Sequence, residues 1–483
     1  MSKKYESVIG LETHIELSTN TKMFCGCKLS FGEESNVYTC PVCLGHPGSL
    51  PVVNKKAVEY AIKIALAVNC KIREYTIFHR KNYFYPDQAK NYQISQYDLP
   101  LGVGGYLDVD MGDYVRRVGI TRVHMEEDTG KLLHTGKTGR ISESGASMVD
   151  FNRGGTPLIE IVTEPDIKSP EEAKEYLIRL RNLILYLGVS NCNMEEGSLR
   201  CDANISVKKI GEKRIGTKTE IKNLNSFKFL QKGLQYEIER QINLLESGKK
   251  VIQQTRHYDS NANMTKVLRS KEEAHDYRYF PEPDLVPMHI ESKVVDDIRC
   301  TVGELPAEKA ERFEKEYKLP KYDSSFLSND KKIAYYFEEC CKLYRDAKNI
   351  SNWIMGDFSA LLNKEGIDIN DSKVKPADLA SMLKIIDEGK INSKIAKSVF
   401  EEMFKTGESP QGIIEKMGLA QISDEDLLED IIEEIIKENP DTVKQYKSGK
   451  KKAIGFLIGR VMAKTKGMAN PRMVNEIMTK KLK

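Results

Sequence analysis

Residues Val8–Leu17 have the sequence VIGLETHIEL, and this stretch decides the first part of the fold. In an extended strand, successive side chains point to opposite sides. One side of this strand would be apolar, and the other would carry Glu12, His14 and Glu16. Antiparallel sheets often have one solvated face, which is the simplest interpretation of such a strand. The alternative is that the polar side holds a cation or a charged substrate group.

The same alternation returns in four later segments, which favours the second interpretation. Their polar sides would carry Arg122, His124, Glu126 and Asp128; Glu160; Arg200, Asp202 and Asn204; and Lys218, Glu220 and Lys222. Carboxylates, histidines and fixed cations that recur in this way are typical of a convergent site. We therefore predict a concave sheet with one polar face. Carboxylates with a histidine suit Mg²⁺, and Arg and Lys would neutralise phosphate charge, so the pattern favours phosphoryl transfer.

Four of the ten cysteines are grouped in two close pairs. Cys25 and Cys27 precede a short loop that leads to Cys40 and Cys43. This spacing suits a tetrahedral zinc site, and four thiolates would leave no open position, so we predict a structural zinc that ties down residues 19–45. Unligated thiols are the alternative. The other six are predicted to be small buried hydrophobic residues: Cys70, Cys192, Cys201, Cys300, Cys340 and Cys341.

Three helices are predicted in the first part of the chain. Asn54 would cap a helix that runs to about residue 68, and a capping box at Ser169–Glu172 would begin a second helix that stops at Gly188. A third helix would follow Asn225 and run to about residue 246. These helices are expected to pack on the apolar side of the sheet and to leave the polar side open.

A loop at His79–Asp87 mixes titratable side chains with aromatic ones. Lys81, Tyr83 and Tyr85 in this loop could bind phosphate and stack on bases or sugars. A packed surface loop explains the same residues equally well.

Length and charge limit the remaining possibilities. A chain of 483 residues has room for about three domains. With 74 basic and 71 acidic residues, the net charge of +3 does not by itself identify a nucleic-acid binder. Nothing resembles a signal peptide or a membrane span, so a cytoplasmic location is expected. There is no P-loop and no nucleophile motif for hydrolysing an amide, so an ATP site would have to be of another kind.

The predicted fold class is α+β. A mostly antiparallel sheet domain with flanking helices and the zinc loop would span residues 1–295, an all-α domain residues 296–407, and a helical tail domain residues 408–483. The tail divides by charge, because residues 424–438 are acidic whereas residues 450–483 contain many Lys and Arg and a single acid, Glu476. Such a basic tail is either a solvated face or a phosphate-binding patch.

Several long strings closely resemble the GatB family, which provides the B-type subunits of the aspartyl/glutamyl-tRNA(Asn/Gln) amidotransferases. They are Val8–Leu17, Arg80–Asp87, His124–Asp128, Gly155–Val162, Met194–Ile205, Lys222–Ser226, Tyr277–Asp284, Gly455–Gly459 and Gly467–Pro471. Together they cover essentially the whole chain. The resemblance implies a cradle-shaped, β-rich domain that binds the acceptor end of a misacylated tRNA.

The resemblance also implies an activity and partners. Members of the family use ATP and Mg²⁺ to phosphorylate the side-chain carboxylate of Glu or Asp on the tRNA, and then aminate it. They form a heterotrimer with a glutamine-hydrolysing A-type subunit, which supplies ammonia through a channel, and with a small C-type subunit. The chain would thus be part of a carbon–nitrogen ligase with glutamine as amido donor, and its tail would hold the outer body of the tRNA.

Roles follow for individual residues. For Mg²⁺ we expect Glu12, His14, Glu126 and Glu160, with Glu127 as the alternative if a bulge shifts that strand. Contacts to ATP phosphates and to the substrate carboxylate are expected from Arg200, Asp202, Asn204, Lys218 and Glu220. Lys81, Tyr83 and Tyr85 would touch the tRNA end or line the ammonia path. A structural ion pair is the competing explanation for each of these residues. Nothing beyond strand parity supports Glu16, which is interpreted as a solvated carboxylate.

Two other functions fit part of the pattern. A zinc-stabilised tRNA-binding module without catalysis would keep the cysteines and the basic tail, but it would not need carboxylates facing polyanionic RNA. The Glu-specific E-type relative would share the cradle and the tail, yet it carries a large additional domain for which this chain is too short. Whether Glu-tRNA, Asp-tRNA or both are substrates stays open.

Overall fold

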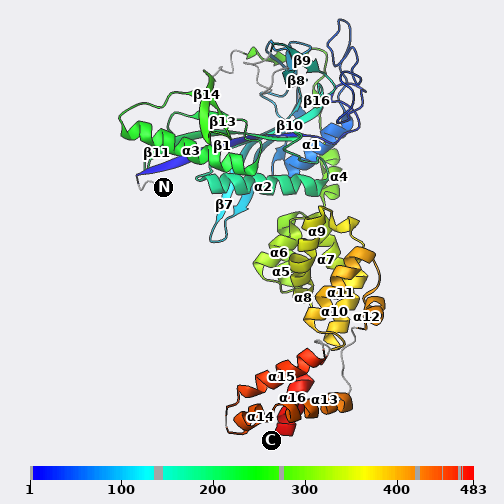
Figure 1. Ribbon diagram of the computed structural model, residues 1–483. Helices are drawn as coiled ribbons and strands as arrows, with labels where there is room; N and C mark the ends of the chain where they lie inside the picture. Colours follow the sequence, from blue (N-terminus) through cyan, green and yellow to red (C-terminus); the bar gives the residue numbers. More distant parts are fainter. Residues whose placement is uncertain are drawn as a thin grey trace. The chain divides into compact units, whose positions relative to one another are not determined.

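The computed structural model describes residues 4–134, 145–270, 277–418, 425–448, 450–465, 469 and 471–482. Contacts within the chain divide it into two compact units, Met1–Leu305 and Pro306–Lys483. The first unit is mixed α and β, and the described part of the second unit is helical. The predicted α+β class with a mostly antiparallel sheet is therefore confirmed. Figure 1 labels many of the elements of both units.

The centre of the first unit is a twelve-stranded sheet. Its main path runs in the order β14-β13-β12-β11-β1-β10-β7-β5-β4-β15, and β6 pairs with β7 and β2 outside this path. All of its pairs are antiparallel except β12 with β13. The bounds are β1 (Tyr5–Glu16), β2 (Lys71–Ile72), β4 (His79–Asn82), β5 (Tyr92–Ser95), β6 (Gly102–Asp110), β7 (Val115–Glu127), β10 (Pro157–Thr163), β11 (Leu199–Lys209), β12 (Thr219–Lys222), β13 (Gln254–Asp259), β14 (Met264–Ser270) and β15 (Phe280–Pro281).

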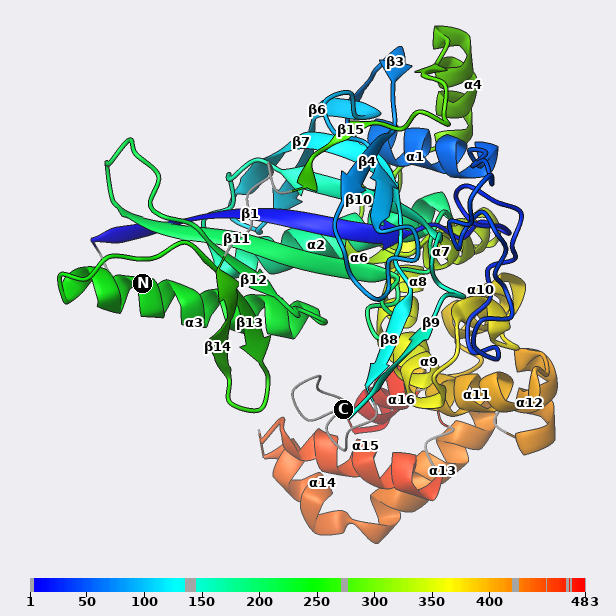
Figure 2. The same ribbon diagram turned by 90° about the horizontal axis from the view of Figure 1, so that it is seen from above.

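Among the residues that the structure describes, two strand pairs stand apart from this sheet. They are β3 (Tyr75–Thr76) with β16 (Met288–His289), and β8 (Lys131–His134) with β9 (Ser147–Asp150). Figure 2 shows the long strands β1 and β11 side by side at the centre of the large sheet.

Helices cover the apolar side of the large sheet. Ile9, Leu11 and Ile15 of β1 are fully buried in one core with residues of α1 (Lys55–Ala67), α2 (Pro170–Leu187) and α3 (Phe227–Glu246). Figure 1 shows α2 and α3 along this side of the sheet. The predicted packing of the helices on the apolar side of the sheet is thus confirmed.

The three helices begin and end at or close to the predicted residues. The side chain of Asn54 accepts hydrogen bonds from the first turn of α1. Ser169 caps α2, and Gly188 ends it in the left-handed conformation with φ of 67°. Ser226 caps α3. Each helix is therefore set by local chemistry at its ends and by the apolar stripe that it presents to the sheet.

A fourth helix, α4 (Ser292–Val302), closes the first unit, since it packs against α1. The division between the units falls after Leu305, beyond the predicted boundary at 295, because this helix belongs with the sheet. The three predicted domain ranges stay predictions.

The described residues of the second unit form two separate hydrophobic cores. The first joins α5 (Pro306–Glu316), α6 (Lys321–Ser328), α7 (Lys331–Leu343), α8 (Ala347–Trp353), the π-helix Ile354–Phe358, α9 (Ser359–Glu365), the short 3-10 helix Ile369–Asp371, α10 (Pro376–Asp387), α11 (Ser393–Thr406) and α12 (Pro410–Met417). The second joins α13 (Glu425–Glu438), α14 (Pro440–Lys447), α15 (Ala453–Lys464) and α16 (Pro471–Leu482). Part of the motif at 467–471 lies outside the described residues. In the described part of the chain, no helix is both long and apolar enough to cross a membrane.

Candidate active site on the polar face of the sheet

The register of four neighbouring strands brings the predicted side chains together. Across β11, β1, β10 and β7, one row of paired positions is Arg200, His14, Glu160 and His124. The next row begins with Asp202 and Glu12 and ends with Arg122. Opposite residues in an antiparallel pair lie about 5 Å apart, so these polar groups form a continuous surface.

Glu160 lies at the centre of this surface and is buried. One of its carboxylate oxygens, Oε2, is 3.4 Å from Nε2 of His14 and 3.4 Å from Nε2 of His124. Its other oxygen lies 3.6 Å from the guanidinium of Arg122. Glu126 is 3.7 Å from His14, and Glu12 is 3.9 Å from the same ring. Three of the four residues expected to bind Mg²⁺ thus surround the fourth, His14.

Burial and close charges shift the pKa values of this group in opposite directions. Burial alone would lower the pKa of His14, but Glu160, Glu126 and Glu12 raise it to about 9. Burial would raise the pKa of Glu160, but His124 and His14 hold it well below the usual value for a glutamate. Burial and the charge of Glu160 raise the pKa of Glu12. Such opposed shifts in one place are typical of functional sites.

The donor atoms fit a bound divalent cation. Ligand atoms of Glu12, His14 and Glu160, and separately of His124, Glu126 and Glu160, all lie within 4.8 Å of one another. Carboxylate oxygens are the ligands that Mg²⁺ and Mn²⁺ prefer, and imidazole extends the choice toward transition metals. The sequence predicts that His124 lies on this face. It does not predict the closeness of His124 to Glu160, because this closeness depends on the pairing of β7 with β10.

Lys81 on β4 is close enough to the same carboxylates for their charges to act on its ammonium. Burial would lower the pKa of its ammonium, but Glu126, the tyrosines Tyr279 and Tyr277, and Glu160 raise it. The ring centroid of Tyr277 is 5.1 Å from the Lys81 ammonium. Tyr83 packs against Tyr277 and accepts a hydrogen bond from Gln88. Lys81 and Tyr83 thus border the site, whereas Tyr85 is largely exposed.

A second polar group lies on β11 and β12. Lys222 donates a 2.6 Å hydrogen bond to Asp202 and lies 3.3 Å from Glu220. Glu220 also accepts a hydrogen bond from Thr255 of β13, and it is paired in register with Asn204. The Oδ1 atom of Asn204 is buried and has no hydrogen-bond partner among the residues that the structure describes. Lys218 is exposed and lies just before β12 begins.

A third polar group lies at the other end of the surface. Arg200 and Arg153 both approach the buried Asp128, at 2.6 and 3.7 Å. Burial would raise the pKa of Asp128, but the two guanidinium groups lower it to about 2. Burial and Asp128 raise the pKa of Glu16 to about 9, and the Oε1 atom of Glu16 is buried. The interpretation of Glu16 as a solvated carboxylate is therefore wrong, because one of its carboxylate oxygens is buried and its charge interacts with Asp128 and the two arginines.

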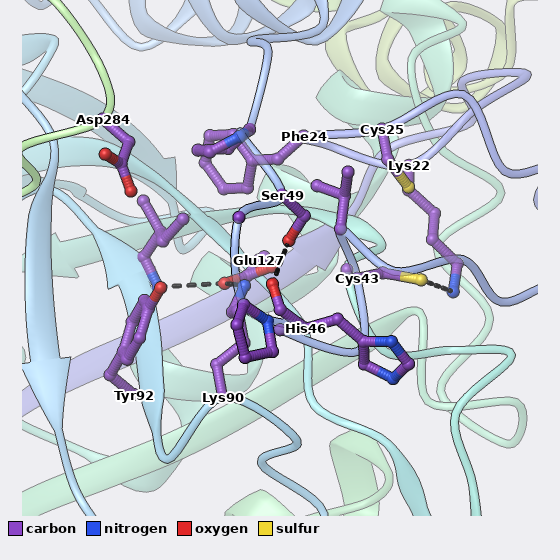
Figure 3. A pocket seen from close by; sticks show the side chains of 17 residues that line it. Lys22, Phe24, Cys25, Cys43, His46, Ser49, Lys90, Tyr92, Glu127 and Asp284 are labelled. Atoms are coloured by element: carbon purple, nitrogen blue, oxygen red, sulfur yellow. Dashed lines mark hydrogen bonds and ion pairs between the residues drawn. The ribbon is translucent and has the colours of Figure 1, made fainter.

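Glu127, the alternative metal ligand, lies on the opposite side of β7. It forms a buried ion pair with Lys90 and accepts a hydrogen bond from the backbone N–H of Ile94. Because β7 and β10 pair regularly here, Glu126 is the residue that points to the polar face. Lys90 and Glu127 line a cavity of about 210 Å³ that also contains Phe24, Tyr92 and Asp284 and that borders the cysteine loop (Figure 3).

The four grouped cysteines also come together. The sulfur atoms of Cys25, Cys27, Cys40 and Cys43 all lie within 4.8 Å of one another, which fits one tetrahedral metal. The hydrogen bond from Cys25 lowers the pKa of the Cys43 thiol to about 4, and Lys22 acts in the same direction. Among the other six, Cys300 is exposed and Cys341 half-buried, so the prediction of buried thiols is wrong for these two. Both lie on amphipathic helices, where spacing alone does not fix the buried side.

Comparison with known proteins identifies the family. The model of the GatB/GatE catalytic domain matches residues 7–296, and the model of the GatB domain matches residues 335–482. The chain belongs to the GatB/GatE family. The resemblance noted in the sequence is therefore confirmed.

Relatives match over nearly the whole chain. Proteins from Carboxydothermus hydrogenoformans and Thermoanaerobacter sp. are each 53% identical over 99% of both chains. A protein from Persephonella marina is 52% identical over 99% of this chain and 100% of its own length. All three are named as the B subunit of aspartyl/glutamyl-tRNA(Asn/Gln) amidotransferase.

Proposed function

We propose that the chain is the B-type subunit of a tRNA-dependent amidotransferase that converts Glu-tRNA(Gln), Asp-tRNA(Asn) or both into the amidated forms. The names of the full-length relatives support this activity and favour a B-type over an E-type member of the family. The observation that carries the proposal is the row Arg200, His14, Glu160 and His124 across four strands, flanked by Glu12, Glu126 and Lys81. A non-catalytic tRNA-binding module would gain nothing from carboxylates on the surface that meets RNA.

The polar face would bind the three reactants, which are ATP, the aminoacyl end of the tRNA and ammonia. We assign Glu12, His14, Glu126 and Glu160 to Mg²⁺, which when bound would neutralise charge on the ATP phosphates. Arg200, held by Asp128, would contact a transferred phosphoryl group, and Lys222, held by Asp202, would contact the substrate carboxylate. Asn204 would donate to the substrate through its amide, and its orphaned Oδ1 would then accept a hydrogen bond from ammonia or the ribose.

The reaction has two steps with a shared intermediate. An oxygen of the side-chain carboxylate attacks the γ-phosphorus of ATP, and ADP leaves. Ammonia then attacks the carbonyl carbon of the acyl phosphate, a proton is lost from nitrogen, and inorganic phosphate leaves. The charges of Glu126 and Glu160 act on Lys81, so its ammonium would neutralise the departing phosphate.

Partners complete the function. The chain has no nucleophile motif for glutamine hydrolysis, so ammonia would come from a glutaminase partner, the A-type subunit, and a small C-type subunit would join the two. The complex would act in the cytoplasm, where aminoacyl-tRNA is used. Exposed cations in the tail, Lys450, Lys451, Lys452 and Arg460, would contact the phosphates of the tRNA body. The cysteine cluster would hold a structural zinc.

The test is ATP-dependent transamidation by the assembled complex, with free ammonia supplied in place of glutamine. Wild type is expected to use ammonia, because the chemistry belongs to this chain. Glu12→Ala is expected to lose phosphorylation of the aminoacyl group while circular dichroism and tRNA binding stay unchanged. Full activity of Glu12→Ala would remove the metal assignment, and binding of tRNA without any ATP-dependent product in wild type would favour the non-catalytic module.

A further inference from the structure

Lys22 is a lysine whose side chain is fully buried beside the cysteine cluster. Its ammonium lies 3.6 Å from Sγ of Cys43 and donates a 3.0 Å hydrogen bond to the backbone carbonyl of Phe151. Figure 3 shows the side chain of Lys22 extended toward the Cys43 sulfur. The same residue closes the base of the loop, since its backbone N–H donates to the carbonyl of Cys27.

A fully buried ammonium requires a nearby negative charge. Moving an unpaired charge out of water is very costly, and buried charges are therefore almost always paired. Among the described residues, the Lys22 ammonium donates to a sulfur and to a carbonyl oxygen, neither of which is a carboxylate. The neighbouring ion pair in the same cavity, Lys90 with Glu127, already uses its own carboxylate.

The cysteine cluster supplies the missing charge when it is loaded. Four thiolates carry four negative charges and a zinc ion carries two positive charges, so the loaded centre has a net charge of −2. Partners outside the ligand set tune such centres and hold their ligands in place. A cation that hydrogen-bonds to one thiolate reduces the net negative charge of the centre and draws electron density from that sulfur.

We infer that Lys22 is an outer-sphere residue of the zinc centre, where its ammonium compensates the charge of the four thiolates and makes Cys43 a poorer nucleophile. The inference rests on the zinc site proposed above. It accounts for the burial of Lys22 and for the direction of its side chain. Gly155 leaves room for this arrangement, because a Cβ at that position would lie 3.3 Å from Cδ of Lys22.

The hydrogen bond from Lys22 to the carbonyl of Phe151 also joins the zinc loop to the active-site surface. Phe151 and Gly155 belong to the turn that carries Arg153, one of the two arginines at Asp128. The backbone N–H of Met23 donates to the carbonyl of Gly155 at 2.7 Å, directly beside Lys22. These two hydrogen bonds to backbone carbonyls therefore also hold the turn that carries Arg153.

The experiment compares zinc release from the purified full-length chain in four variants. Lys22→Met keeps the length of the side chain and removes the charge, Lys22→Gln gives a second neutral side chain, and Lys22→Arg keeps the charge. Lys28→Met is the matched control, because Lys28 is an exposed cation of the same loop that lies over the ring of Tyr38. Zinc is followed by absorbance with 4-(2-pyridylazo)resorcinol, and alkylation of Cys43 by iodoacetamide is followed by mass spectrometry.

Zinc release from Lys22→Met and Lys22→Gln is expected to be about 10- to 100-fold faster than from wild type, with faster alkylation of Cys43. Lys22→Arg and Lys28→Met are expected to stay within a few-fold of wild type. Should the neutral variants fail to fold, a folded Lys22→Arg that retains zinc supports the same conclusion. Loss of zinc or of the fold in Lys22→Arg as severe as in Lys22→Met would overturn the inference, as would unchanged release from Lys22→Met. Wild type that binds no zinc at all would instead remove the zinc assignment itself.

Discussion

Arg200 on β11 donates a 2.6 Å hydrogen bond to Asp128, which follows the last residue of β7. The contact spans β1 and β10, so it joins two strands that are not neighbours in the sheet. Arg153 approaches the same carboxylate oxygen from the turn before β10. One buried carboxylate thereby fixes two guanidinium groups at the edge of the carboxylate cluster.

Replacement of Asp128 by Asn should release Arg200 from this position. We expect kcat/KM for ammonia-dependent transamidation to fall on the order of 10²-fold, because a small displacement of a phosphate-binding group is costly in the transition state. Asp108→Asn is the control, since Asp108 forms a comparable but exposed pair with Arg117. Equal kinetics for the two variants would show that the Asp128 pair has only a structural role.

Removal of metal from the cysteine cluster should destabilise the first unit. Structural zinc sites contribute directly to folding free energy, so a chelator is expected to lower the Tm by several degrees. Cys25→Ser should have the same effect, whereas Cys300→Ser, an exposed cysteine on α4, should have none. Thermal unfolding followed by circular dichroism measures the Tm of the chelated protein and of the two variants. An unchanged Tm after verified removal of zinc would contradict a structural role.

Glu237 on α3 is the centre of a buried polar network that is distant in sequence from the carboxylate cluster. It accepts hydrogen bonds from Arg240, Gln241 and Thr265, and its side chain is fully buried. Glu237→Gln leaves Arg240 without its counter-charge and should cost roughly 3 kcal/mol of unfolding free energy. Urea unfolding measures this difference, and Glu239→Gln on the exposed side of the same helix is the control.

The effect of Glu237 should also depend on pH. Burial alone would raise its pKa, but Arg240 and Gln241 lower it from the usual value of 4.5. A carboxylate with a lowered pKa stabilises the folded state above its unfolded pKa, and this contribution is lost as pH falls through the folded pKa. The stability difference between wild type and Glu237→Gln should therefore be constant between about pH 5.5 and about pH 7, and shrink below about pH 4. A difference that persists undiminished at low pH would contradict the assignment.

Local features of the fold could be predicted because their causes are local. Alternation in β1 placed Glu12 and His14 on one side, and Asn54 and Ser169 marked the starts of helices. The grouping of the cysteines likewise follows from their spacing. These features depend on residues that are close together in the sequence.

The other features of the fold and the site depend on which strands pair with each other. The periodicity of a sequence does not indicate this pairing. The sequence does not say that β10 lies between β1 and β7, so the approach of His124 to Glu160 could not be predicted. Glu16 had the right parity, but its burial depends on Asp128, which lies far along the chain. Nothing in the sequence indicated that Lys22 is buried, since a lysine is usually exposed.

The central claim is that the carboxylate cluster around Glu160 supports phosphorylation of the aminoacyl side chain. The most direct measurement is a single turnover with γ-³²P-labelled ATP, misacylated tRNA and the assembled complex without any amide donor. Glu160→Gln should form labelled acyl phosphate and ADP at least about 100-fold more slowly than wild type. Glu164→Gln, an exposed glutamate just after β10, should match wild type. Formation of ADP by Glu160→Gln at the wild-type rate would contradict the claim.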